Sequence, residues 1–243
     1  MILSPMTVAG LQRALAEGWR MASATRGISF GYALIFTLGG LLIMGSLLAL
    51  GWTPFIIAAA GAFMLVGPII LAGFFGIAGA QDAGQPVGPG SIVSGFARAS
   101  RALWALALVC ALLFMIFITD AAILYAYMVG ATPVWLDNLL PANTNVLSFV
   151  RWAGVSGFVV ALLLYAVAAF SVPLLCECRS GLVEAVVLSV RVVFANFMPA
   201  IFWAFLLSTI IIGSILLLPL LPLTLPWMAY ASRALYRQVL PTS

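Results

Sequence analysis

Residues 197–232, FMPAIFWAFLLSTIIIGSILLLPLLPLTLPWMAYAS, are 36 consecutive residues without a charge. A transmembrane helix needs about 20 apolar residues, so this stretch is too long for one ordinary span and barely long enough for two. Pro219, Pro222 and Pro226 argue against one straight helix, because each proline removes a backbone donor and crowds the preceding turn. We predict two short spans, over about 197–217 and 219–235; the alternative is one long kinked span.

The rest of the chain is nearly as apolar. Hydrophobic residues make up 65% of it and charged residues 7%, and its mean hydropathy is +1.24. A soluble domain carries roughly 25% charged residues, so lipid must solvate much of this protein. Four more spans are expected, over about 27–51, 55–80, 102–130 and 152–175. The sequence therefore predicts an all-α fold, a polytopic membrane helix bundle of six transmembrane helices in a single integral membrane domain over residues 1–243.

The arginines predict how the bundle sits in the membrane. With the N-terminus in the cytoplasm, six spans leave nine of the ten arginines inside and only Arg151 outside. Five spans would move Arg233 and Arg237 across the membrane. The positive-inside bias therefore favours six spans with both termini in the cytoplasm, and we expect the protein in the bacterial inner (cytoplasmic) membrane.

Residues 1–26 are predicted to form a cytoplasmic amphipathic segment. Ser4-Pro5 fits an N-cap followed by proline at the first helical position. Apolar residues at spacings of three and four share one face of the following helix: Val8, Leu11, Leu15 and Trp19. We expect this N-terminal helix to lie at the membrane interface with its arginines near anionic headgroups, and the alternative is a partly ordered leader.

Two more helices are expected on the cytoplasmic side. One starts near residue 91, with Ser91 as its N-cap, and continues into the span at 102–130. The other is a short connecting helix over about 181–195, in which Glu184 and Arg191 share a face because they lie seven residues apart.

The residue types that the chain lacks narrow its chemistry. It contains no His and no Lys, so the usual zinc sites, haem ligation, Ser–His catalysis, Schiff bases and a phosphate-loop lysine are excluded. We expect no catalytic residues, no cofactor and no metal site. The protein is predicted to be non-enzymatic, and nucleic acid is not an expected partner.

Asp120 is the sharpest candidate for a functional residue. It lies in the predicted span 102–130, and a carboxylate at the bilayer centre costs about 2.5–3.5 kcal/mol, so such residues face the bundle interior and have a partner. One interpretation is a proton or cation site whose pKa is raised by burial. The other is a structural acid, paired with Arg151 or hydrogen-bonded to Tyr125.

A second group of charged residues is expected on the cytoplasmic face. It consists of Asp82, Glu177, Arg179, Glu184 and Arg191. A solvated, ion-paired surface is one interpretation of this group, and a docking patch for a partner protein is the other.

The chain resembles a proteobacterial family of uncharacterised six-span integral membrane proteins, some of which are labelled cytochrome c oxidase subunit-like. The resemblance covers most of the chain and lies in these segments: Gly18-Trp19-Arg20, Gly31-Tyr32, Gly67-Pro68, 72–75 (AGFF), 83–87 (AGQPV), 170–175 (FSVPLL) with Arg179, 185–189 (AVVLS) with Asn196, and Pro226 with Tyr236-Arg237. The family's usual S-R-x-x-E segment is replaced here by residues 77–82 (IAGAQD). Its two closing His are absent from residues 227–233 (WMAYASR). The resemblance implies a six-span inner-membrane fold and no known activity.

These observations favour two functions. The first is an accessory or scaffold subunit that packs against other membrane protein subunits of a larger, energy-transducing complex, such as an electron transport complex. It fits the short loops, the missing cofactor ligands and the small residues on the helices. The alternative is a small-solute or ion transporter or channel that uses Asp120.

Overall fold

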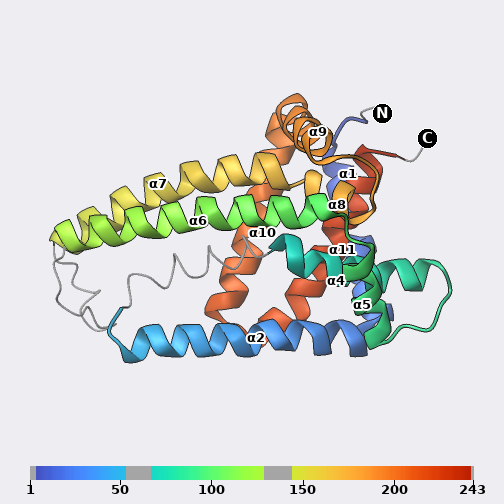
Figure 1. The fold of residues 1–243 in the computed structure, drawn as a ribbon, viewed down its shortest axis with the longest axis horizontal. Coiled ribbons are helices and arrows are strands. Elements are labelled where there is room, and N and C mark those ends of the chain that lie inside the picture. Colours follow the sequence, from blue (N-terminus) through green and yellow to red (C-terminus); the bar gives the residue numbers. More distant parts are fainter. Residues whose placement is uncertain (1–3, 53–66, 129–143, 242–243) are drawn as a thin grey trace.

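The computed structural model describes residues 4–52, 67–128 and 144–241 (Figure 1). Within these ranges all regular structure is helical and there is no strand, which confirms the predicted all-α class. The helices Arg26–Ala49, Arg101–Met128 and Thr144–Ala168 extend in one direction, and both ends of the described chain lie together at the other end of the molecule (Figure 1). We call this second end the polar end, because the charged network described below lies there.

Four segments are long and apolar enough to cross a membrane. They are α2 (Arg26–Ala49), α6 (Arg101–Met128), α10 (Phe197–Leu216) and Arg151–Cys176, which joins most of α7 (Thr144–Ala168) to α8 (Ser171–Cys176). These segments correspond to four of the six expected spans. The first part of the expected span 55–80 lies outside the described residues, and its described part is α4 (Gly67–Asp82). The count of six spans stays a prediction.

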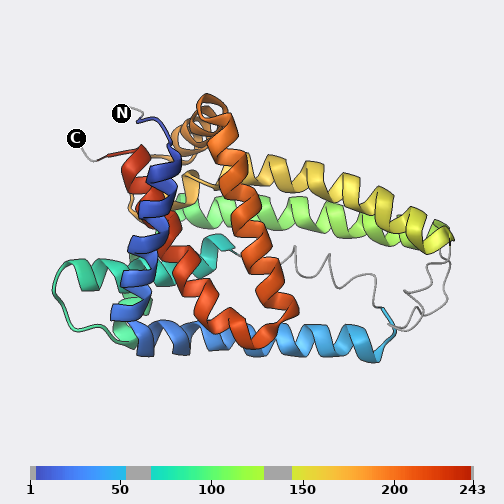
Figure 2. The same cartoon turned by 180° about the vertical axis from the view of Figure 1, so that it is seen from behind.

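The C-terminal part of the chain folds back against the bundle. α10 is followed by the short 3-10 helix η3 (Leu218–Leu220) and by α11 (Leu221–Val239), so the chain turns where the prolines predicted. In both views α10 runs across the direction of α2 and α6 (Figures 1 and 2). The turn packs against α2: a Cβ built on Gly40 would lie 3.3 Å from Leu218 Cδ2.

The N-terminal helix α1 (Val8–Ala24) lies along α11 (Figure 2). Leu11, Ala14 and Gly18 are buried in this contact, and a Cβ on Gly18 would lie only 2.5 Å from the backbone nitrogen of Ala231. Val8 is exposed although the predicted apolar face included it. Trp19 of the same face is exposed as well, whereas Leu11 is buried against α11 together with Ala14 and Gly18. The position of the apolar face at the membrane interface stays a prediction.

The prediction that Ser4 is the N-cap of the N-terminal helix was wrong. Thr7 is the N-cap, and its Oγ1 accepts a hydrogen bond from the backbone nitrogen of Gly10 at 3.1 Å. Ser4 instead donates its backbone N–H to the carbonyl of Val239 at 3.0 Å. The segment before α1 is therefore tied to the end of α11, and the two ends of the chain meet.

The predicted continuous helix from residue 91 into the span 102–130 is interrupted. α5 (Pro89–Arg98) ends where Ala99 takes an extended ψ of 129°, and α6 begins at Arg101. Ser91 is not the N-cap of α5; it is the third helical residue, and its Oγ accepts a hydrogen bond from the backbone nitrogen of Gly88 at 3.3 Å. α5 folds back onto α4, and the connecting helix α9 (Leu182–Ala195) forms close to its predicted bounds.

Candidate functional site

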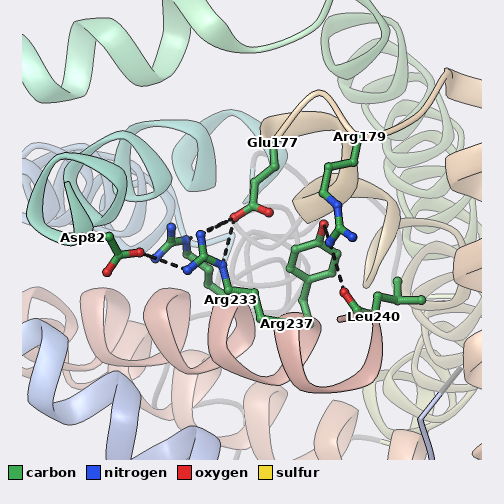
Figure 3. Close-up of polar contacts among 7 residues, drawn as sticks. Asp82, Glu177, Arg179, Arg233, Arg237 and Leu240 are labelled. Atoms are coloured by element: carbon green, nitrogen blue, oxygen red, sulfur yellow. Dashed lines mark hydrogen bonds and ion pairs between the residues drawn. The ribbon is translucent and has the colours of Figure 1, made fainter. Parts of the chain in front are cut away.

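Four charged side chains from three elements meet at the polar end of the molecule (Figure 3). Asp82 is the last residue of α4, Glu177 caps α8, and Arg233 and Arg237 lie on α11. Because residues four apart are neighbours on a helix surface, both guanidinium groups reach the same two carboxylates. We call these four residues the ion-pair network.

Each arginine of the network contacts both acids. Nη1 of Arg233 lies 2.9 Å from Oδ2 of Asp82, and its Nε lies 3.5 Å from Oε1 of Glu177. Arg237 donates to the same two oxygen atoms, each at 3.0 Å. The two arginines differ in burial, since the Arg233 side chain is 9% exposed and that of Arg237 is 47% exposed. The network joins α4 and α8 to α11.

Arg179 lies beside the network and holds the end of α11 (Figure 3). Its Nη1 donates to the phenol oxygen of Tyr236 at 2.7 Å and to the carbonyl of Leu240 at 3.0 Å, and Nη2 donates to the carbonyl of Pro241 at 3.3 Å. Burial raises the pKa of Tyr236 to about 12, so the phenol is neutral at pH 7. Arg179 is therefore held by hydrogen bonds to neutral oxygen atoms.

The structure brings together only part of the cytoplasmic group expected from the sequence. Asp82 and Glu177 share the network, and Arg179 is next to it. Glu184 and Arg191 are exposed on α9 and form no ion pair among the described residues. The group expected from the sequence does not include Arg233 and Arg237, although their spacing of four residues, next to an apolar stretch, is a signal that points to them. A docking role for the group stays a prediction.

Asp120 lies on the exposed side of α6, not in the interior of the bundle as expected. Its Oδ2 accepts a hydrogen bond from Oγ of Ser156 on α7 at 3.3 Å. Arg151 is also exposed, and no ion pair joins it to Asp120 in the described part of the chain. Asp120 follows Arg101 by 19 residues, which is about 28 Å along a helix, so it lies far from the ion-pair network.

A family model matches residues 55–177, just over half of the chain, and its description is "Predicted integral membrane protein (DUF2189)". The chain belongs to this family. Membership shows that the chain is an integral membrane protein of an uncharacterised family, so it lies in a lipid bilayer. Nothing among curated proteins or among solved structures matches the chain.

The DUF2189 match covers one part of the candidate site and not the other. Asp82, Asp120 and Glu177 lie within the matched residues, whereas Arg233 and Arg237 on α11 follow them. The carboxylates of the ion-pair network therefore belong to the matched region, and its guanidinium groups come from the C-terminal part of this chain.

Proposed function

We propose that this protein is a non-enzymatic accessory or scaffold subunit, which packs against a larger membrane complex in the bacterial inner membrane with both termini in the cytoplasm. We favour an energy-transducing complex as the host. The observation that carries the proposal is the exposure of Asp120 on an otherwise apolar side of α6.

The surroundings of Asp120 support the proposal of a partner. Ile116 and Ile123, one turn before and after it on the same face, are each 65% exposed. In lipid, the carboxylate would have the hydroxyl of Ser156 as its one described hydrogen-bond donor. Exposed acids are costly inside a membrane and pair with other polar groups. A helix of a neighbouring subunit that places a donor or a cation beside Asp120 removes this cost.

The same geometry gives less support to a transporter. A path through one chain needs polar groups that face its interior between Asp120 and the polar end. On α6 this stretch offers two polar residues. Cys110 is buried, and the hydroxyl of Thr119 donates a hydrogen bond to the carbonyl of Met115 in the same helix. A small-solute or ion transporter that uses Asp120 is the second candidate, supported by the ionisable residue itself.

A photo-crosslinking experiment tests the proposal. A photoreactive amino acid replaces Ile123 next to Asp120, or Leu42 on α2, which is 72% exposed and serves as the control position. We expect position 123 to crosslink to one discrete membrane protein in cells, Asp120→Leu to reduce this product, and position 42 to give none. A monodisperse monomer after mild extraction, with no crosslink at position 123, would contradict the proposal. Proteoliposome uptake that is lost in Asp120→Asn would favour the transporter.

A further inference from the structure

A cavity of about 190 Å³ lies beside the ion-pair network, between α4, α5, the end of α8 and α11. Its charged lining residues are Arg98, Glu177, Arg233 and Arg237, and glycines of α4 and α5 form part of the opposite wall. Three guanidinium groups and one carboxylate thus line one small space. This cavity is separate from the exposed face around Asp120, so it is independent of the proposed function.

The cavity carries an excess of positive charge. Arg233 and Arg237 are compensated, because they share the carboxylates of Asp82 and Glu177. Arg98 is exposed at the end of α5, and none of the described carboxylates forms an ion pair with it. Among the residues that line the cavity, Arg98 is therefore the one positive charge without a described carboxylate, and an anion beside it would balance that charge.

The glycines of the wall divide into two kinds. Gly76 on α4 and Gly95 on α5 hold the two helices in contact, because a Cβ on Gly76 would clash with the carbonyl of Ser91 and lie 2.6 Å from Cα of Gly95. Gly79, one turn after Gly76, lines the cavity, and a Cβ on it would meet no atom within 4 Å. The space beside Gly79 is therefore open.

The position and the chemistry of the cavity identify its ligand. α4 ends at Asp82 and α6 begins at Arg101, so the cavity lies where apolar helices give way to charged residues, the level of lipid phosphates. Guanidinium groups bind phosphate through paired, charge-assisted hydrogen bonds. We propose that the cavity binds a phosphate group, with Arg98 as the residue that gives it net affinity for the anion. An anionic lipid headgroup and free phosphate share this chemistry.

Binding of phosphatidylglycerol to the full chain tests this site. The purified protein is delipidated in neutral detergent and titrated with phosphatidylglycerol in native mass spectrometry, and with inorganic phosphate in calorimetry. We expect one tightly retained anion, with an affinity roughly tenfold lower in Arg98→Gln, which loses one charge-assisted contact. Gly79→Leu fills the open space and should abolish binding.

Two matched variants control for general effects. Arg101→Gln removes another exposed arginine that has no described ion pair, and Gly39→Leu places the same side chain at an open glycine on α2. Both should bind like the unchanged protein. Retention of phosphatidylglycerol that inorganic phosphate does not displace identifies the lipid as the source, and tight binding of inorganic phosphate alone identifies free phosphate. Arg98→Gln and Gly79→Leu proteins that keep the thermal stability of their controls and bind equally well would overturn the site.

Discussion

Arg233 and Arg237 contact the same two carboxylates but differ in burial, so the effects of substituting them on stability can be compared directly. Arg233→Met leaves the 18% exposed carboxylate of Glu177 with a single partner, so we expect a loss of about 3 kcal/mol in the free energy of unfolding. Arg237→Met removes a half-exposed group and should cost less than about 1 kcal/mol. Denaturant unfolding in detergent measures both, and equal losses would contradict the difference in burial.

Gly18 is the residue on which the contact between α1 and α11 depends. In Gly18→Ala the new Cβ meets the backbone of Ala231, so the helices must separate, at a cost of about 1–3 kcal/mol. Gly31→Ala on α2 is the control, because a Cβ there meets nothing within 4 Å and alanine favours a helix. We expect a lower melting temperature for the first variant and an unchanged or higher one for the second. The opposite order would show that this close approach does not exist.

The acids of the network could be predicted from the sequence, but their partners could not. Asp82 and Glu177 stand out because each follows a long apolar run, where charge is rare. The pairing of Asp82 with Arg233 joins residues 151 positions apart and that of Glu177 with Arg237 residues 60 positions apart, and no local pattern encodes such contacts. The N-cap of α1 also depends on a contact between distant residues. Ser4 and Thr7 are both residue types that cap helices, but Ser4 is bonded to Val239, and Thr7 is the N-cap.

The long apolar helices are the elements that the sequence predicts best. The expected span 102–130 is α6, Arg101–Met128, because bilayer thickness sets the length of such a run and charged residues limit it. The short interruptions are not predicted. α5 ends just before Ala99, where no glycine or proline marks the break. The break is set by the packing of α5 back onto α4, which the local sequence does not encode. The prolines of residues 219–226 did predict the turn into α11.

The depth of the turn between α10 and α11 in the membrane distinguishes a folded-back hairpin from two complete spans. Leu218 packs against Gly40, which lies 14 residues after Arg26, about 21 Å along α2 and within its apolar part. In a protein without other cysteines, Leu218→Cys should therefore resist membrane-impermeant thiol reagents from either side. Two complete spans would expose it to reagents from outside. Trp52→Cys, just after α2, is the accessible control, and labelling of position 218 as fast as position 52 would contradict the hairpin.

The whole molecule brings its two ends together, and this constrains how often the chain crosses the membrane. An odd number of spans would separate the ends by the bilayer, about 30 Å, whereas Ser4 and Val239 are joined by a hydrogen bond of 3.0 Å. We therefore expect an even number of spans, whether α10 and α11 cross completely or fold back. Arg179 strengthens this closure through its hydrogen bonds to the carbonyls of Leu240 and Pro241.

The distribution of charge predicts the side of the membrane on which both ends lie. Arg233 and Arg237 lie on α11, and Arg179 contacts Leu240 and Pro241 just after it, so these arginines gather at the end where the termini lie. Arg151 begins the apolar segment that returns to this end. The positive-inside bias predicts that the arginine-rich end lies in the cytoplasm. Reporters of compartment fused separately to either terminus should therefore both report the cytoplasm. Two periplasmic reporters would reverse the orientation but keep the fold, whereas reporters on opposite sides would contradict the contact between α1 and α11 on which the closed arrangement depends.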